Sequence, residues 1–156
     1  KSFIQELSKR DILRQSLVLI SSDIGNPLLS EKSSDFSMTQ QHVPMIALWP
    51  QDSLKGISYK NLTSNFDIAP TIGLEILGIT TPCVNYSIGN SLLKITDRDY
   101  LLTTQGRSLL LISTDNVTVY KRNGKVHIDE NGKLRDAKPN LENLIRAMRE
   151  LNRFKG

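Results

Sequence analysis

The feature that most constrains the fold of this chain is the apolar run from Leu17 to Ile20. Four large apolar residues in succession, two of them β-branched, are typical of a strand covered on both faces, as in a parallel sheet. The run stops in Ser21-Ser22-Asp23-Ile24-Gly25, so we expect a buried strand over residues 17–22. Ligands of open α/β sheets bind beyond the carboxyl ends of the strands. Asp23 is therefore the first residue to consider for chemistry.

The other segments before residue 97 are predicted to form further helices and strands. Residues 2–14 are expected to form a helix, and residues 43–49 a second strand that begins near Pro44. A helix is expected over 68–77, with Pro70 in its first turn, where a missing N–H is tolerated. We therefore assign residues 1–96 to an α/β core.

The pattern changes after residue 97. Short strands rich in β-branched and aromatic residues are separated by turns, of which Asn123-Gly124 gives the strongest hairpin signal. A helix over 140–154 follows, with an apolar stripe that we expect to pack on one face of the sheet; a membrane-surface helix is the alternative. Residues 97–156 are thus predicted to form an antiparallel meander with a terminal helix. The expected strands are 100–104, 109–114, 117–121 and 125–128, and the stripe is Leu141, Leu144, Ile145, Met148 and Leu151.

The charge of the chain is concentrated near its end. The net charge is +4, and from residue 121 onward Lys and Arg outnumber Asp and Glu by ten to five. Such a region can face anionic lipid head groups, or it can be a solvated helix face. Because Phe154 is the sole aromatic residue after Tyr120, base stacking is poorly supported and nucleic acid is not an expected partner. The candidate lipid- or anion-binding residues are Lys121, Arg122, Lys138, Arg146, Arg149 and Arg153.

The single cysteine, the second histidine and the lengths of the apolar runs add little to the prediction of function. The lone Cys83 has no internal disulfide partner and is interpreted as structural, and His127 is expected to be exposed. No apolar run approaches the ~18 residues of a membrane helix, and the chain does not open with a signal peptide.

Three motifs in order resemble the second half of the sulfatases and their relatives in the alkaline phosphatase superfamily. These are Ser22-Asp23-Ile24-Gly25 after the strand, the segment 41–50 (QHVPMIALWP), and the segment 66–78 (FDIAPTIGLEILG). Within that group, residues 81–92 and 131–139 resemble the periplasmic domain of the inner-membrane YejM (PbgA) family. The resemblance covers about residues 16–156.

The resemblance implies a fold and a setting. The fold is α/β: the C-terminal part of a mostly parallel sulfatase-like sheet with helices, followed by a small antiparallel sheet and a C-terminal helix. The setting is the periplasmic face of the bacterial inner membrane, with an N-terminal membrane part and the rest of the same polypeptide lying before this chain. The implied partners are an anionic lipid, cardiolipin or lipid A, and an envelope regulatory protein, in the control of lipopolysaccharide and outer-membrane lipids.

The resemblance also locates a possible metal site. In active relatives the Asp and His of an Asp-His-Gly turn bind metal, whereas the nucleophile comes from an earlier segment and has no counterpart here. Asp23 keeps the carboxylate, but Ile24 replaces the imidazole and an alkyl group cannot bind a metal. His42 is a weaker candidate ligand. No cofactor is therefore expected unless the chain is active, in which case the cofactor is a divalent ion such as Zn, Mn, Mg or Ca.

Two functions remain open from the sequence. The first is a non-catalytic regulator with the sulfatase fold that binds or senses lipid, for which Ile24 at the His position is the main argument. The alternative is an active metal-dependent sulfatase, phosphoesterase or phosphoethanolamine-type transferase, which the retained Asp23 favours.

Overall fold

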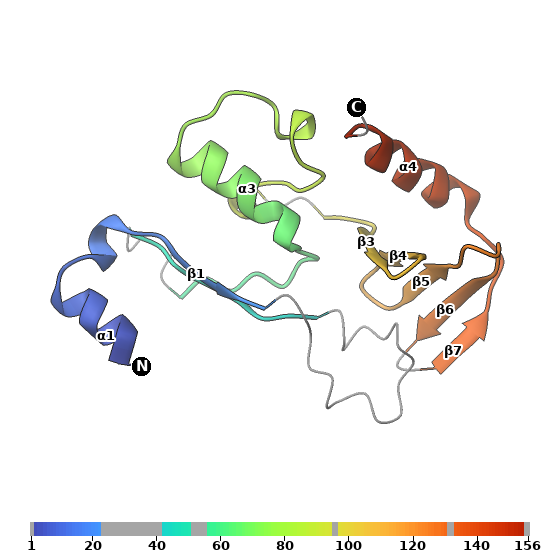
Figure 1. Cartoon of the computed structure of the whole chain (residues 1–156), viewed down its shortest axis with the longest axis horizontal. Helices are drawn as coiled ribbons and strands as arrows, with labels where there is room; N and C mark the ends of the chain where they lie inside the picture. The colour runs from blue at the N-terminus through green and yellow to red at the C-terminus, as the bar shows by residue number, and fades with distance from the viewer. Residues whose placement is uncertain (1, 23–41, 51–55, 95–96, 131–132, 155–156) are drawn as a thin grey trace. The chain divides into compact units, whose positions relative to one another are not determined.

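The structure, a computed structural model, describes residues 2–22, 42–50, 56–94, 97–130 and 133–154 (Figure 1). The described residues fall into two units, one up to residue 60 and one from residue 61 onward. The boundary predicted at residue 96 lies inside the second unit.

The first unit contains a short helix and a two-stranded sheet. Helix α1 (Ser2–Lys9) and a 3-10 turn (Leu13–Gln15) precede strand β1 (Val18–Ser21), which pairs with strand β2 (Met45–Leu48). The helix ends earlier than the predicted residue 14 because the chain turns at Asp11, whose φ is 57°. None of the side chains whose exposure is described in this unit is fully buried.

The pairing of β1 corrects the expectation of a parallel, fully covered strand. β1 and β2 run antiparallel, with Val18 opposite Leu48, and Ile20 is 46% exposed. An apolar run indicates that a strand has two faces to cover, but it does not encode the direction of its neighbour. Within the described residues β2 is the neighbour of β1, and the remaining apolar surface of the strand stays uncovered.

The second unit begins with a composite helix. A 3-10 turn (Asn65–Asp67) leads into α3 (Ile68–Thr71), and residues Ile72–Ile76 continue the same axis with π-helical winding. Gly78 follows with a φ of 64°, a left-handed conformation that suits a helix C-terminus. The predicted helix over 68–77 is confirmed.

A five-stranded antiparallel sheet follows, with its strands in sequence order. They are β3 (Leu101–Gln105), β4 (Ser108–Ile112), β5 (Val117–Tyr120), β6 (Val126–Glu130) and β7 (Lys133–Asp136). The meander and its turn at Gly124, where φ is 81°, are confirmed. Strand β7 is not among the predicted strands, because all four of its residues are exposed and this edge strand carries no apolar alternation.

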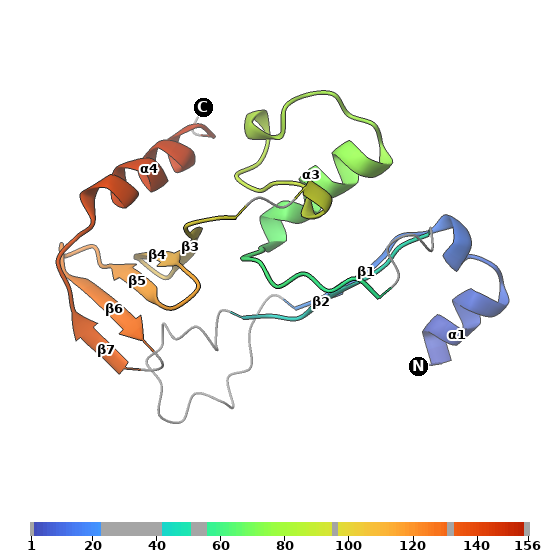
Figure 2. The ribbon, with the colours of Figure 1, turned by 180° about the vertical axis from the view of Figure 1, so that it is seen from behind.

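Helix α4 (Leu141–Asn152) covers one face of this sheet. Ala147 is fully buried against Leu102, Leu111, Tyr120 and Val126, and Leu144 and Leu151 pack around them. The Asn140 side chain caps the helix by accepting a bond of 3.1 Å from the Asn143 N–H. Figure 2 shows from behind that α4 follows the last strand of the sheet. The mixed α/β class, the antiparallel sheet and the terminal helix are therefore confirmed.

The opposite face of the sheet also carries a hydrophobic core. Leu110, Val117 and Val119 have no exposed surface, and Ile112 packs with them.

We expect Leu110→Ala to lower the free energy of unfolding by roughly 2–5 kcal/mol, because it removes buried methyl groups and leaves a cavity. Urea unfolding of the full chain measures this effect. The exposed control Leu77→Ala, at a residue that is 66% exposed, is expected to change stability by about 0.5 kcal/mol at most; equal losses in both variants would contradict a core on this face.

Candidate functional site

The centre of the second unit is a buried carboxylate, that of Asp67. Its side chain is 1% exposed and accepts four hydrogen bonds. The backbone N–H groups of Ser64 and Asn90 each donate over 2.7 Å. The Arg98 guanidinium donates twice, through Nη1 over 2.9 Å and through Nη2 over 2.5 Å. A bidentate arginine and two backbone amides compensate for the loss of water around a buried charge.

The sequence around Asp67 explains why the carboxylate is placed there. Asp67 is the third residue after Ser64, so its side chain bonds back to the Ser64 N–H in the manner of a capping box. One turn further on, the Thr71 hydroxyl donates to the Asp67 carbonyl over 2.6 Å and accepts from the Leu92 N–H over 2.8 Å. The Asp-x-x-Pro-Thr motif thus begins a helix and fastens the following loop to it.

That loop contains residues 81–92, the first of the two segments that resemble the YejM family. The Ser87 hydroxyl donates to the Phe66 carbonyl and accepts from the Gly89 N–H, each over 2.9 Å. A Cβ atom at Gly89 would lie 2.1 Å from the Phe66 carbonyl oxygen, so only glycine fits there. The loop residues therefore serve to hold the Asp67 site together. Cys83 contributes a contact of 3.6 Å from its sulfur to the Asn90 side chain, which agrees with a structural role.

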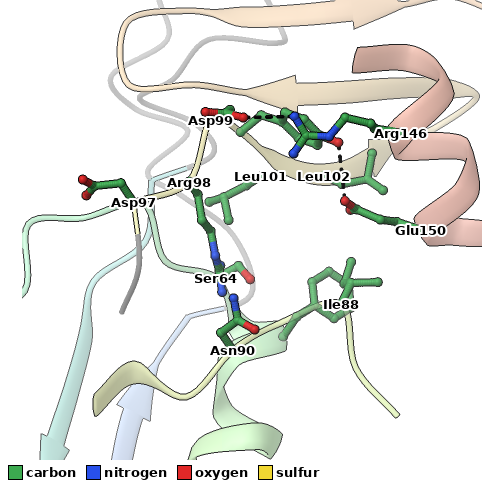
Figure 3. A pocket seen from close by; sticks show the side chains of 12 residues that line it. Ser64, Ile88, Asn90, Asp97, Arg98, Asp99, Leu101, Leu102, Arg146 and Glu150 are labelled. Atoms are coloured by element: carbon green, nitrogen blue, oxygen red, sulfur yellow. Dashed lines mark hydrogen bonds and ion pairs between the residues drawn. The ribbon is translucent and has the colours of Figure 1, made fainter. Parts of the chain in front are cut away.

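A cavity of about 240 Å³ lies beside this site (Figure 3). Both of its guanidinium groups are held by carboxylates: Arg98 by Asp67, and Arg146 by Asp99 over 3.0 Å. Three carboxylates also line it, so its walls carry no excess of positive charge and do not favour an anion. The lining residues are Ser64, Phe66, Ile88, Asn90, Asp97, Arg98, Asp99, Tyr100, Leu101, Leu102, Arg146 and Glu150.

Tyr100 connects the cavity to helix α4. Its ring lies 5.3 Å from the Arg146 guanidinium, and its hydroxyl donates to Glu150 over 3.4 Å. Partial burial, followed by the charge of Glu150, raises the pKa of the Tyr100 hydroxyl above its usual value. Tyr100 therefore stays protonated at neutral pH and acts as a hydrogen-bond donor that fixes the helix.

The predicted metal ligands are not brought together in the described structure. Asp23 and Ile24 lie outside the described residues, and His42 is an exposed residue just before β2. Among the residues that are described, no group of three or more His, Cys, Asp or Glu side chains is placed to hold a metal ion.

The predicted basic residues separate into two kinds. Arg146 is paired with Asp99, and Lys121 is half-buried at the end of β5. The others are exposed, and the described part of the chain offers them no carboxylate within 4.0 Å. These exposed residues are Arg122, Lys138, Arg149 and Arg153.

His127 corrects the expectation of an exposed histidine. Its side chain is 12% exposed, and Nδ1 lies 2.9 Å from the carboxylate of Asp136 on the neighbouring strand. Among the residues that the structure describes, none is a hydrogen-bond partner of Nε2. The sequence placed His127 among charged residues, but its strand position aligns it with Val119 on a covered face of the sheet.

Sequence reasoning missed the residues that assemble this site: Asn90, Arg98, Tyr100 and Glu150. The signal that could have indicated Arg98 is its position between Asp97 and Asp99 just before a strand. Its partner Asp67 is thirty-one positions earlier, and local patterns do not specify a pair at that separation.

The sequence of the chain matches one known protein family. The sequence model of the sulfatase family matches residues 1–79, half of the chain, so the chain belongs to the sulfatase family.

The chain is also similar to two curated bacterial inner membrane proteins. It is 30% identical over 155 residues to the inner membrane protein YejM of Salmonella typhimurium and, to the same degree, to that of Salmonella typhi. The match covers 97% of this chain and 26% of each relative, so the chain spans about a quarter of the length of these curated proteins. The resemblance drawn from the motifs is confirmed. In the described part of the chain, no helix has the length and apolar character needed to cross a membrane.

The Asp67–Arg98 pair yields a stability prediction. Replacing Arg98 by alanine leaves a buried carboxylate without its counter-charge, so we expect Arg98→Ala to lower the free energy of unfolding by roughly 3–5 kcal/mol. The control Arg135→Ala breaks the exposed pair with Glu130 and is expected to lose at most about 1 kcal/mol. Urea unfolding of both variants measures the difference, and similar small losses would show that Asp67 is not a structural centre.

Proposed function

We propose that this chain is the part of a sulfatase-fold domain that binds anionic lipid head groups at the cell envelope without hydrolysing an ester. The observation that carries the proposal is the set of exposed basic side chains, Arg122, Lys138, Arg149 and Arg153, for which the described residues supply no acidic partner. The positive charge of such a side chain is not neutralised by a neighbouring carboxylate, so it attracts the phosphate groups of a lipid. The cavity, whose cations are already paired, is a poorer anion site.

Two features support a non-catalytic role. Ile24 stands where active relatives place a metal-binding histidine, and an alkyl side chain cannot replace it. Asp67, the carboxylate of the other sulfatase-like motif, is fully engaged by Ser64, Asn90 and Arg98 and is not available to a metal or substrate.

The setting of the proposal comes from the relatives. Their name describes them as inner membrane proteins, which agrees with a chain that meets lipid. We propose the periplasmic side of that membrane, cardiolipin or lipid A as the anionic lipid, and a regulatory role in lipopolysaccharide control through an envelope protein partner.

Binding to anionic vesicles tests the lipid part of the proposal. We expect the full chain to co-sediment with vesicles that contain phosphatidylglycerol and not with pure phosphatidylcholine vesicles. Binding should weaken as salt rises from about 0.1 M to about 1 M, because the screening length falls from about 10 Å to about 3 Å. Binding that is absent, or equal on both kinds of vesicle, would contradict the proposal.

Metal content distinguishes the proposal from the enzymatic alternative. We expect no stoichiometric Zn or Mn in the complete domain, because Ile24 removes an imidazole ligand, and a gain of metal in Ile24→His. Elemental analysis beside Asp23→Ala measures this, together with hydrolysis of phosphate and sulfate esters. Metal in the wild-type protein that disappears in Asp23→Ala, with ester hydrolysis, would favour the enzyme.

A further inference from the structure

Helix α4 carries apolar side chains on two faces, and the sheet covers only one of them. Ala147, Leu144 and Leu151 pack on the sheet. Leu141, Ile145 and Met148, which belong to the same predicted stripe, remain 62%, 49% and 52% exposed. The spacings of four and three residues place these three side chains on one face of the helix. The apolar stripe of the helix therefore includes three large side chains that the sheet does not cover.

Basic side chains continue this exposed face. Leu141, Ile145, Arg149 and Arg153 follow one another at intervals of four residues, so they form one row along the helix. The Arg153 guanidinium lies 5.4 Å from the ring of Phe154, which is itself 44% exposed. The row therefore passes from apolar side chains at its start to cations beside an aromatic ring at its end.

The acidic side chains of the helix leave the arginine end of this face positive. Glu150 accepts a bond from Tyr100 on the side of the helix that faces the cavity. Glu142 lies in the first turn, at the opposite end of the helix from Arg153.

The fold holds this face in a fixed orientation. The Tyr120 hydroxyl donates to the Asn140 carbonyl over 3.2 Å at the start of the helix. Arg146 is tied to Asp99 and Glu150 to Tyr100, both toward the start of β3. Because these bonds hold the start of the helix to β5 and its later turns to the residues just before β3, the exposed face needs no rearrangement to meet a partner.

We propose that this face of α4 docks on the surface of an anionic bilayer. Leu141, Ile145 and Met148 enter the boundary between head groups and acyl chains, while Arg149 and Arg153 contact the lipid phosphates. An apolar face bordered by cations is the pattern of helices that lie in a membrane interface. Charge complementarity favours an anionic lipid surface over an apolar protein groove. The inference rests on the lipid-binding part of the proposed function and assigns it to a particular surface.

Paired substitutions on the full chain test the apolar and basic parts separately. We expect Ile145→Ser with Met148→Ser, and Arg149→Gln with Arg153→Gln, each to reduce binding to phosphatidylglycerol vesicles by roughly tenfold or more. The matched control is Arg10→Gln with Arg14→Gln, which removes the same charge from exposed arginines of the first unit and should bind within about twofold of the wild type. Circular dichroism and urea unfolding verify that each variant is folded.

A fluorescence measurement provides a readout that does not depend on loss of binding. Tryptophan introduced by Met148→Trp in a Trp49→Phe background should shift its emission to the blue on addition of phosphatidylglycerol vesicles and be quenched by brominated acyl chains. Tryptophan at the exposed control position, Leu77→Trp, should do neither.

The outcomes separate the inference from the function on which it rests. If the wild-type chain binds anionic vesicles and the α4 variants bind equally well, the docking face lies elsewhere and the inference fails while the proposed function stands. If the wild-type chain binds no vesicles, both fail. If sedimentation shows that the exposed apolar stripe joins two copies in solution and that vesicles do not dissociate them, a second copy is the partner and the inference is overturned.

Discussion

The buried pair between Asp67 and Arg98 is the interaction on which the second unit depends. Removing a carboxylate from water is unfavourable unless several donors replace the lost solvent. Here a bidentate arginine and the N–H groups of Ser64 and Asn90 do so, and each donor comes from a different part of the chain. The carboxylate therefore joins the start of α3, the loop that follows it and the approach to β3. In that loop Gly89 lies against the Phe66 carbonyl, where a side chain does not fit.

This arrangement separates the structural motifs of the chain from its candidate binding surface. The sulfatase-like Asp-x-x-Pro-Thr segment and the loop after it are occupied in holding each other, and the cavity beside them has its cations already paired. Positive charge without an acidic partner in the described structure is found instead on the surface, and Arg149 and Arg153 place part of it on α4 and at its end. A role that relies on attraction to anionic lipid therefore agrees with the distribution of charge better than a role centred on the cavity.

Local sequence patterns specify some elements of this chain and not others. The meander was predictable because β-branched strands alternate with turns such as Asn123-Gly124, and the terminal helix because Asn140 precedes an apolar periodicity. Strand β7 escaped prediction because an exposed edge strand needs no apolar residues. The antiparallel partner of β1 escaped because its apolar run specifies burial but not direction. His127 was misjudged because charged neighbours in sequence do not reveal the face of the sheet on which a side chain lies.

Residue type and local spacing were enough to identify the sulfatase-like motifs, the order of most elements and the basic character of the chain from residue 121 onward. The structural role of the Asp67 carboxylate became visible in the folded chain alone, because its partner Arg98 is remote in sequence. The fold also determines how the apolar stripe of α4 is divided. A helix of 3.6 residues per turn shows a single broad stripe in sequence, but the sheet beneath it can cover only the side chains that point toward it. Leu144, Ala147 and Leu151 meet the sheet, and Leu141, Ile145 and Met148 remain at the surface.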